Sequence, residues 1–252
     1  MAAPGARPTL PAVSEPITRR VVAAEPIPQG GGIECFDTTP ALQINEARLA
    51  HLAALGLPLD ARRVLEVGAG VGHLSDFFLE RECDLVVTEG RADNVAELRR
   101  RLPSVDAHQR DVEEPLLDLG RFAVVFCYGL LYHLENPIRA LRNMADVCDE
   151  LLLIETMVCD SPLPVMRLDD EPRTVNQALH GIANRPSISY LAMALNRIGF
   201  DHVYAPHSLP QFPDYDFEPV GNLDTIRGHP LRAVLVASRH ELGLATLSPL
   251  LA

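Results

Sequence analysis

A short apolar run followed at once by three glycines is the feature that most constrains this chain. Residues 63–75 read Arg-Val-Leu-Glu-Val-Gly-Ala-Gly-Val-Gly-His-Leu-Ser. The apolar and β-branched residues before the glycines are typical of a parallel strand covered on both faces. Gly68, Gly70 and Gly72 allow a turn in which the backbone approaches a ligand closely or takes positive φ values. A helix expected to begin near Gly72 would point its free N–H groups at this turn, which predicts a site for a negatively charged group.

Acidic residues follow at the ends of the next two expected strands. The strand Asp84–Glu89 places Glu89 about twenty residues after Gly68, where nucleotide-binding α/β units carry the acid that binds ribose hydroxyls. A third strand, around 105–109, runs into Asp111 and Val112. Because the carboxyl ends of parallel strands meet at one edge of a sheet, these residues are expected to share one ligand site.

Strand and helix patterns alternate along the rest of the chain. We expect helices at 42–55, 74–80, 93–102, 137–147 and 187–198, and further strands at 122–127, 151–156, 202–205 and 232–238. This alternation predicts an α/β fold, a Rossmann-like seven-stranded doubly wound sheet that is mostly parallel with an antiparallel last strand.

The domain organisation follows from composition. Residues 1–32 are rich in proline and end in three glycines, which predicts a flexible arm before a single domain over 33–240. Two insertions are expected in that domain, at 157–186 and 206–230, and residues 241–252 form a tail. The first insertion contains a short expected helix at 175–180 and is expected to cover the substrate, because long insertions in compact domains are usually functional.

Charge and cysteine content narrow the function classes. The formal net charge of −12 disfavours a nucleic-acid substrate, since phosphate binding normally needs a basic surface. All 22 basic residues are arginine, which suggests a GC-rich coding genome. Five scattered cysteines without a Cys-x-x-Cys pair are typical of reduced thiols and indicate no zinc site. The sequence shows no apolar leader and no membrane span, so we expect a soluble cytoplasmic protein. A homodimer is compatible with the sequence.

The order of these motifs resembles the class I S-adenosylmethionine-dependent methyltransferases over roughly residues 40 to 240. Their first motif, an acid, a residue and Gly-x-Gly-x-Gly, stands here as Glu66-Val67-Gly68-Ala69-Gly70-Val71-Gly72. A dinucleotide dehydrogenase would more typically carry its third glycine one place later. The resemblance implies S-adenosylmethionine as cofactor and the following cofactor-binding residues: Glu66, Gly68, Gly70, Gly72, Glu89, Asp111, Val112 and Cys127.

The loop after the fourth strand carries the expected chemistry. Residues 131–137, Leu-Tyr-His-Leu-Glu-Asn-Pro, are similar to those of a bacterial subgroup acting on small molecules or, in some members, on modified tRNA uridine. His133 is the expected catalytic proton acceptor, because a neutral imidazole can take a hydroxyl proton at physiological pH, and Tyr132 is expected to orient the substrate. Alternatively, His133 only caps or packs against the helix that begins at Pro137.

Candidate substrate-binding residues come from this loop, the first insertion and the N-terminal part of the domain. They are Tyr128, His180, Arg185 and Phe36. Phe36 either folds over the cofactor, as in several members of the resembled family, or packs on the body. Arg185 either binds an anionic substrate group or pairs with an acid among residues 169–171. Those acids, with Glu155, are also possible Mg²⁺ ligands, but runs of acids are usually solvated surface, so no metal is expected.

The leading hypothesis is a methyltransferase that moves a methyl group from S-adenosylmethionine to a small molecule, such as a secondary metabolite or sugar. One alternative is a tRNA-modifying transferase of the same fold. Another is a methyltransferase-like protein that acts as a cyclase, an isomerase or a non-catalytic partner. Aromatic residues in the two insertions suggest a substrate with apolar or ring-containing parts.

Overall fold

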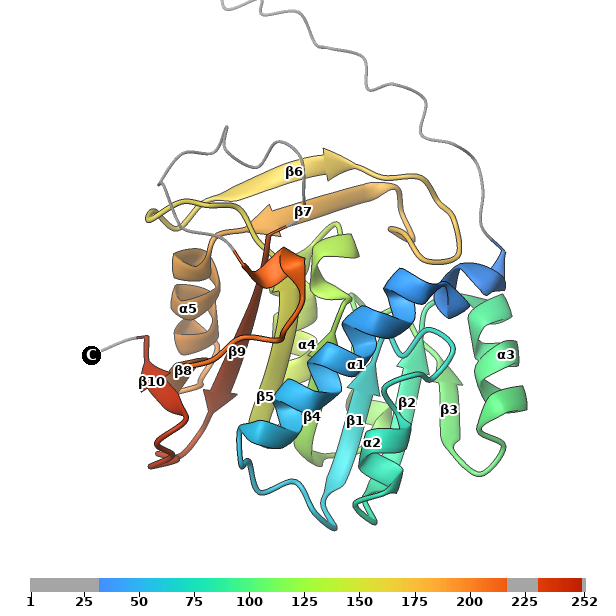
Figure 1. Cartoon of the computed structure of the whole chain (residues 1–252), viewed down its shortest axis with the longest axis horizontal. Helices are drawn as coiled ribbons and strands as arrows, with labels where there is room; N and C mark the ends of the chain where they lie inside the picture. The colour runs from blue at the N-terminus through green and yellow to red at the C-terminus, as the bar shows by residue number, and fades with distance from the viewer. Residues whose placement is uncertain (1–31, 217–230, 251–252) are drawn as a thin grey trace, which may run out of the picture.

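The computed structural model describes residues 32–216 and 231–250. Its main feature is an eight-stranded sheet in the order β10-β8-β9-β5-β4-β1-β2-β3 (Figure 1). The strands of this sheet are β1 (Arg63–Val67), β2 (Asp84–Glu89), β3 (Asp106–Gln109), β4 (Phe122–Tyr128), β5 (Cys148–Met157), β8 (His202–Pro206), β9 (Arg232–Ser238) and β10 (Leu247–Pro249). The five strands from β3 to β5 pair in parallel, whereas β9 is antiparallel to both β5 and β8. The expected Rossmann-like α/β fold is therefore confirmed.

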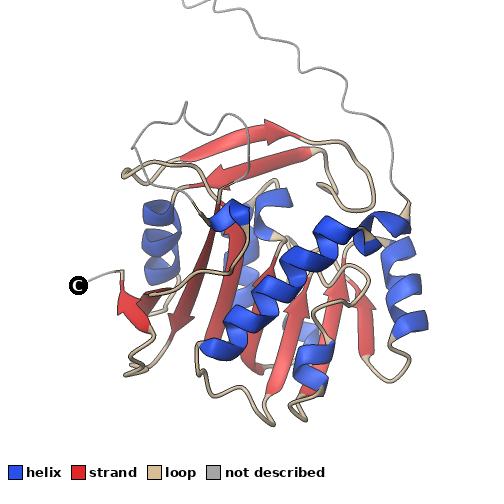
Figure 2. Ribbon diagram, viewed as in Figure 1, coloured by secondary structure: helices blue, strands red, loops and turns tan. Residues whose placement is uncertain are grey.

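Helices cover both faces of the sheet (Figure 2). They are α1 (Thr39–Ala54), α2 (Asp76–Leu79), α3 (Ala92–Arg101), α4 (Pro137–Val147) and α5 (Ile188–Arg197), with short 3₁₀ turns η1 (Ile33–Asp37), η2 (Leu117–Leu119), η3 (Leu131–His133) and η4 (Pro213–Tyr215). Neighbouring residues of a strand point to opposite faces. Accordingly, Val125 packs with α4 and α5 in one apolar cluster, and Val124 packs with α1, α2 and α3 in the other.

A separate two-stranded hairpin lies across the carboxyl ends of the parallel strands (Figure 1). Its strands are β6 (Met166–Asp170) and β7 (Ile182–Pro186), which pair antiparallel. The buried amide of Asn184 in β7 donates to the carbonyls of Leu131 and Leu134 at 2.9 and 2.7 Å. The hairpin thus fixes the loop that follows β4, which positions the cavity described below.

The fold differs from the sequence-based expectations at three places. The sheet has eight strands, because residues 247–249 of the expected tail pair with the edge strand β8. The first insertion forms the β6–β7 hairpin, and residues 175–180 form a turn followed by bends rather than a helix. The segment after Gly72 turns several times before α2, which is only four residues long, so it presents no long helix dipole to the glycine turn.

Two expectations concern residues outside the described part of the chain. The N-terminal arm, apart from Gly32, and residues 217–230 of the second insertion lie there. Within the described ranges, no helix is long and apolar enough to cross a lipid bilayer.

A buried ionic cluster joins several elements at the carboxyl end of β5. Glu155 is completely buried, and its carboxylate accepts hydrogen bonds from Arg48 of α1 at 2.6 Å and Arg232 of β9 at 3.0 Å. The hydroxyl of Tyr215 donates to it at 2.8 Å, and Asp214 pairs with Arg232 at 3.1 Å. Burial would raise the pKa of Glu155, but the two arginines outweigh it and keep the carboxylate ionised.

Replacing Glu155 should therefore destabilise the fold. Glu155→Gln leaves the buried guanidinium of Arg48 without a carboxylate and that of Arg232 with Asp214 alone, and breaking a buried ion pair in this way costs about 3–5 kcal/mol. Urea denaturation measures this change in the free energy of unfolding. The matched control is Glu150→Gln on the same strand, where the carboxylate pairs with Arg62 and is 41% exposed, so the expected loss is below about 1 kcal/mol. Equal losses for the two variants would contradict the role assigned to the cluster.

Candidate functional site

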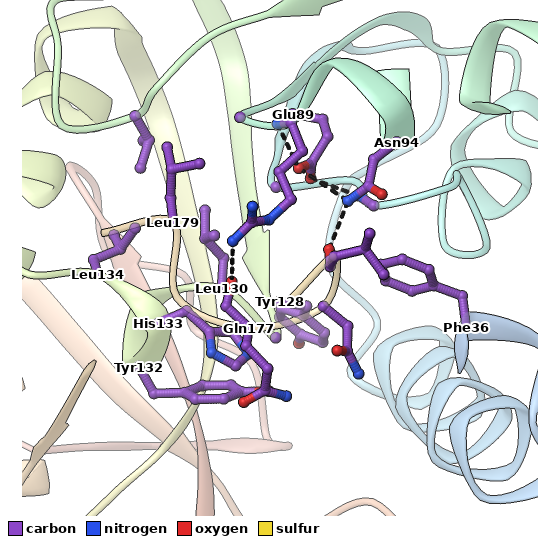
Figure 3. Close-up of a pocket in the computed structure, with 18 of the residues that line it drawn as sticks. Phe36, Glu89, Asn94, Tyr128, Leu130, Tyr132, His133, Leu134, Gln177 and Leu179 are labelled. Carbon is purple, nitrogen blue, oxygen red and sulfur yellow. Dashed lines mark hydrogen bonds between the residues drawn. The ribbon is translucent and has the colours of Figure 1, made fainter. Parts of the chain in front are cut away.

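A cavity of about 450 Å³ lies at the carboxyl ends of β1, β2 and β4. The hairpin β6–β7 and the loop between its strands cover it on one side, and η1 and the start of α1 border it on another (Figure 1). Figure 3 shows Glu89 and Asn94 at one end of the cavity and Tyr132 and His133 at the other. The two ends carry different chemical groups.

The glycine turn after β1 forms part of the wall. Gly68 and Gly70 have φ values of +68° and +57°, which L side chains rarely adopt. A Cβ atom at Gly68 would lie within 2.7–2.9 Å of the Leu130 side chain, and one at Gly70 would lie 3.0 Å from the ring of Phe36. Glycine at these two positions therefore keeps the backbone close to the cavity.

Glu89 supplies a carboxylate at the same end. One oxygen, Oε2, accepts from the backbone N–H of Gly70 at 3.1 Å, and Oε1 accepts from the N–H of Arg91 at 3.0 Å and the amide of Asn94 at 3.2 Å. Burial raises the pKa of Glu89, and these hydrogen bonds oppose that shift. The acid is thereby tied to the glycine turn and to the start of α3.

Asp111 and Val112 line the cavity next to Glu89, after β3. One oxygen of Asp111 accepts from the backbone N–H of Glu113 at 2.9 Å, and the other lies 2.9 Å from Nε2 of His180. His180 comes from the loop between β6 and β7. Strand ends that are separate in sequence thus meet that loop at this end of the cavity.

Residues 171–181, here called the cover loop, close this end of the cavity. The guanidinium of Arg91 donates to the carbonyls of Gln177 and Ala178 at 3.2 and 3.0 Å, and the Asn94 amide donates to the carbonyl of Val175 at 2.8 Å. The neck of the loop is closed by the N–H of Glu171, which donates to the carbonyl of Gly181 at 3.1 Å. The expected cover therefore rests on the residues next to Glu89.

His133 and Tyr132 lie at the other end, in η3 after β4. Nδ1 of His133 is 2.5 Å from Oε2 of Glu171, and Oε1 of Glu171 accepts from Arg185 at 3.0 Å. No hydrogen-bond partner for Nε2 of His133 occurs among the described residues. This nitrogen is therefore free to accept a proton from a molecule in the cavity.

The protonation of this pair follows from its surroundings. Burial lowers the pKa of His133, against the raising effect of Glu171, so the imidazole is neutral at physiological pH. Burial alone would raise the pKa of Glu171, but hydrogen bonds from His133 and Arg185 hold it below its ordinary value. An ionised Glu171 accepts a hydrogen bond from the N–H at Nδ1 of a neutral His133, which leaves an unprotonated Nε2.

Tyr132 connects the cavity with the ionic cluster. Its hydroxyl accepts from Arg232 at 3.2 Å, and the guanidinium groups of Arg232 and Arg185 lie 4.9 and 5.3 Å from its ring centre. Tyr128 also lines the cavity, and its buried hydroxyl has no hydrogen-bond partner within residues 32–216 and 231–250. These contacts hold the Tyr132 ring in one orientation beside His133.

The structure brings most of the sequence-predicted site residues to this one cavity. Those that line it are Phe36, Gly68, Gly70, Glu89, Asp111, Val112, Tyr128, Tyr132, His133, His180 and Arg185. Phe36 packs on Gly70, and Arg185 pairs with Asp169 and Glu171.

Three expected cofactor-binding residues lie outside the lining. Glu66 is buried beneath the glycine turn, where the hydroxyl of Ser75 donates to it at 2.6 Å and burial raises its pKa to about 7. A Cβ atom at Gly72 would meet Leu102 of the α3 end, so this glycine allows close packing. Cys127 is completely buried in the apolar core. In this structure these residues support the turn and the strand rather than face the cavity.

Several cavity residues were missed in the sequence. They are Arg48, Arg91, Asn94, Glu171 and Arg232. Glu171 was considered only as a partner of Arg185 or as a metal ligand. Arg48 did carry a signal, because it occupies the apolar face of α1 together with Ile44 and Leu52, and all three are buried. For Arg91 and Asn94 there was none, since the cover-loop carbonyls to which they donate are distant in the sequence.

The edge of the cavity near Gly70 is held by a surface ion pair. Both oxygens of Asp37 in η1 accept from Arg101, at 2.8 and 2.7 Å, and His73 lies 2.9 Å from the same carboxylate. Arg101 stands at the last position of α3 and also donates to Glu97 at 2.7 Å. The helix α3 thus anchors η1 at one end and the cover loop at the other.

Three of the four acids considered as Mg²⁺ ligands have other partners. Glu155 is bound by two arginines, Glu171 by His133 and Arg185, and Asp169 by Arg167 and Arg185. Among the described residues, no group of three or more His, Cys, Asp or Glu side chains is arranged to hold a metal ion.

The sequence of this chain matches a known family over most of the described domain. The profile described as a methyltransferase domain covers residues 41–205. Curated relatives include the tRNA U34 carboxymethyltransferases of Syntrophotalea carbinolica, 29% identical over 81% of this chain and 68% of the relative, and of Pasteurella multocida, 26% identical over 76% and 65%. The chain thus spans about two thirds of the length of these two relatives.

Solved structures share the fold at lower sequence identity. The N-terminal domain of EvdMO1, solved in the presence of SAH and D-fucose, is 22% identical with a TM-score of 0.61, covering 81% of this chain and 84% of that one. Magnesium protoporphyrin IX methyltransferase from Synechocystis PCC 6803 with bound SAM is 16% identical with a TM-score of 0.54, covering 85% and 87%.

The anchoring of the cover loop can be tested without any ligand. Arg91→Ala removes two hydrogen bonds from a charged donor, each worth about 1.5 kcal/mol or more, so amide hydrogen exchange in residues 174–180 should quicken at least about tenfold. Exchange measured by mass spectrometry checks this. Arg110→Ala is the control, because Arg110 also borders the cavity but donates to Gln109 and Asp118. Unchanged exchange in Arg91→Ala would show that the loop is held by other contacts.

Proposed function

The chain belongs to the methyltransferase domain family, and from this premise we propose that it is an S-adenosylmethionine-dependent methyltransferase acting on a hydroxyl group of a small molecule. The observation that carries the proposal is the pair of His133 and Glu171 at one end of the cavity, opposite the glycine turn and Glu89. A neutral imidazole with a free Nε2 is the group that a hydroxyl acceptor requires for loss of its proton.

The residues at the other end of the cavity fit the cofactor. A Cβ atom at Gly68 or Gly70 would intrude on neighbouring side chains, so the turn offers backbone rather than side chains to a ligand. Glu89 has the carboxylate that would accept from ribose hydroxyls, and Asp111 with Val112 would border the adenine. When bound, S-adenosylmethionine supplies a methyl group on a sulfonium, which is open to in-line displacement.

The protein supplies orientation, proton transfer and exclusion of water. Tyr132, held by Arg232, positions the acceptor beside His133, and Nε2 of His133 takes the hydroxyl proton as the new bond to carbon forms. The cover loop and the hairpin close the cavity above these groups. Alignment within a closed cavity and a positioned base are sufficient for this reaction class.

Three observations support a small acceptor. The cavity of about 450 Å³ is within the range of small-molecule sites, roughly 300–1,000 Å³, and is covered by a hairpin and a loop. The chain carries a net charge of −12, which does not favour a polyanionic substrate. Structural neighbours named for small or medium-sized acceptors include the porphyrin enzyme and a glycopeptide N-methyltransferase.

Replacing the proposed base should reduce turnover without loss of cofactor binding. His133→Asn removes the proton acceptor, a contribution of about 10²–10⁴-fold in rate. In the unaltered enzyme, kcat should rise with pH through a pKa below 6.5 and then level off, because only neutral His133 accepts the proton. Methyl transfer from radiolabelled S-adenosylmethionine to a panel of hydroxylated acceptors measures both effects.

Two variants serve as controls for this experiment. His108→Asn, beside Asp106 on β3, should keep full activity. Glu89→Ala should instead weaken SAH binding about tenfold or more in calorimetry, because it removes the carboxylate at the cofactor end. An undiminished rate and unchanged pH profile in His133→Asn would refute the assignment of the base.

A second candidate is a tRNA-modifying transferase, which is favoured by the names of the curated relatives. It predicts tRNA binding that weakens steeply as salt is raised, since affinity would come from neutralised phosphates. We expect no such binding at about 50 mM salt, where the phosphate contribution is strong. Filter binding of bulk tRNA across a salt series, with and without SAH, measures this. Salt-sensitive micromolar binding would favour the second candidate over the first.

A further inference from the structure

The cover loop links the cofactor end of the cavity to His133 through one buried residue. The guanidinium of Arg91 donates to the carbonyl of Ala178 at 3.0 Å, and the N–H of Ala178 donates to Oε2 of Glu171 at 3.1 Å. The same oxygen of Glu171 lies 2.5 Å from Nδ1 of His133. Ala178 is completely buried, so these contacts are shielded from competing water.

The starting point of this chain of contacts is tied to the proposed cofactor acid. The backbone N–H of Arg91 donates to Oε1 of Glu89 at 3.0 Å, and Asn94 bridges that oxygen and the carbonyl of Val175. A ligand that binds to Glu89 therefore affects Arg91 and Asn94, the two residues that hold the cover loop. Any free energy that this transmits to His133 must also act in the reverse direction.

The other end of the chain of contacts holds the imidazole in one tautomer. Ionised Glu171 can only accept a hydrogen bond and has no proton to donate, so it selects the form of His133 with the proton on Nδ1. Arg185 fixes the second oxygen of Glu171 and is itself held by Asp169 and by the carbonyls of Tyr132 and Asn184. If the cover loop opened, Glu171 would lose the N–H of Ala178, and its hold on His133 would weaken.

We infer that Glu171 is a positioning residue that couples contact between the cover loop and Arg91 to the tautomer of His133. Nε2 of His133 is then held ready to accept a proton only when the loop covers the cofactor end of the cavity. The inference rests on the proposed role of His133 as proton acceptor. It adds that the loop and the base act as one unit and that Arg91, whose hydrogen bonds do not reach His133, influences that base.

The test is nitrogen-15 NMR of the histidine rings in the SAH-bound protein, which requires no acceptor. The charged groups facing His133 are Glu171, Arg185 and Arg232. Glu171→Gln should lower the fraction of His133 with the proton on Nδ1 and lower its pKa by about one unit or more, because a carboxylate in contact is lost. Asp170→Asn, the same change at the exposed neighbouring acid, should leave both quantities unchanged.

Arg91→Ala is the decisive variant, because it alters only the far anchor of the loop. It should move the tautomer and the pKa of His133 in the same direction as Glu171→Gln, with Arg110→Ala as the unchanged control. An unchanged His133 in Arg91→Ala would overturn the coupling even if Glu171→Gln failed to fold. An unchanged His133 in folded Glu171→Gln would overturn the positioning role.

These outcomes remain separate from the test of the proposed function. His133→Asn reports through the rate of methyl transfer, whereas the coupling is read from the ring nitrogens of an intact His133. Full activity of His133→Asn would refute the base while leaving the coupling to be judged by the NMR result. With an acceptor in hand, Glu171→Gln should lower kcat more than it changes KM, since orientation of the base affects the chemical step.

Discussion

The ionisation of Glu155 at the end of β5 constrains the arrangement of the whole cavity edge. A buried carboxylate is tolerated only with compensating charges and hydrogen bonds, and here these come from α1, β9 and η4. Elements from the beginning, middle and end of the chain must therefore meet at one point. Because Arg232 also holds Tyr132, the requirement to neutralise Glu155 fixes part of the proposed acceptor site.

The parts of the fold that were predicted from the sequence depend on local patterns. The strand ending at Glu89 and the helix Pro137–Val147 have the expected bounds, because apolar periodicity and a proline at the helix start are local signals. The helix after the glycine turn was overestimated, since successive turns satisfy the backbone there before α2 begins. The hairpin β6–β7 was missed because Leu168 and Ile182 remain exposed, whereas a buried position of β7 carries the polar Asn184, so the strands show no apolar alternation.

The candidate site shows the same limit. The glycines and acids after β1, β2 and β3 could be assigned to one edge because parallel topology brings strand ends together. The partners of His133 and Arg91 could not be assigned, because Glu171 and Ala178 are placed by the path of a loop with no periodic pattern. The aromatic residues expected to contact substrate illustrate this further, since Tyr215 is buried against Glu155 instead.

The position of α3 between two anchored segments has a geometric consequence. This helix of ten residues spans about 15 Å. At its start, Arg91 and Asn94 bind the cover loop, and at its end Arg101 binds η1. The length of α3 therefore fixes both the distance between the two anchors and their relative orientation about the helix axis. Each added residue would rotate one end by roughly 100° relative to the other. A single insertion in α3 would leave the sheet intact yet point one anchor away from its target. The register of a surface helix thus limits how the enclosure of this cavity can change over evolution.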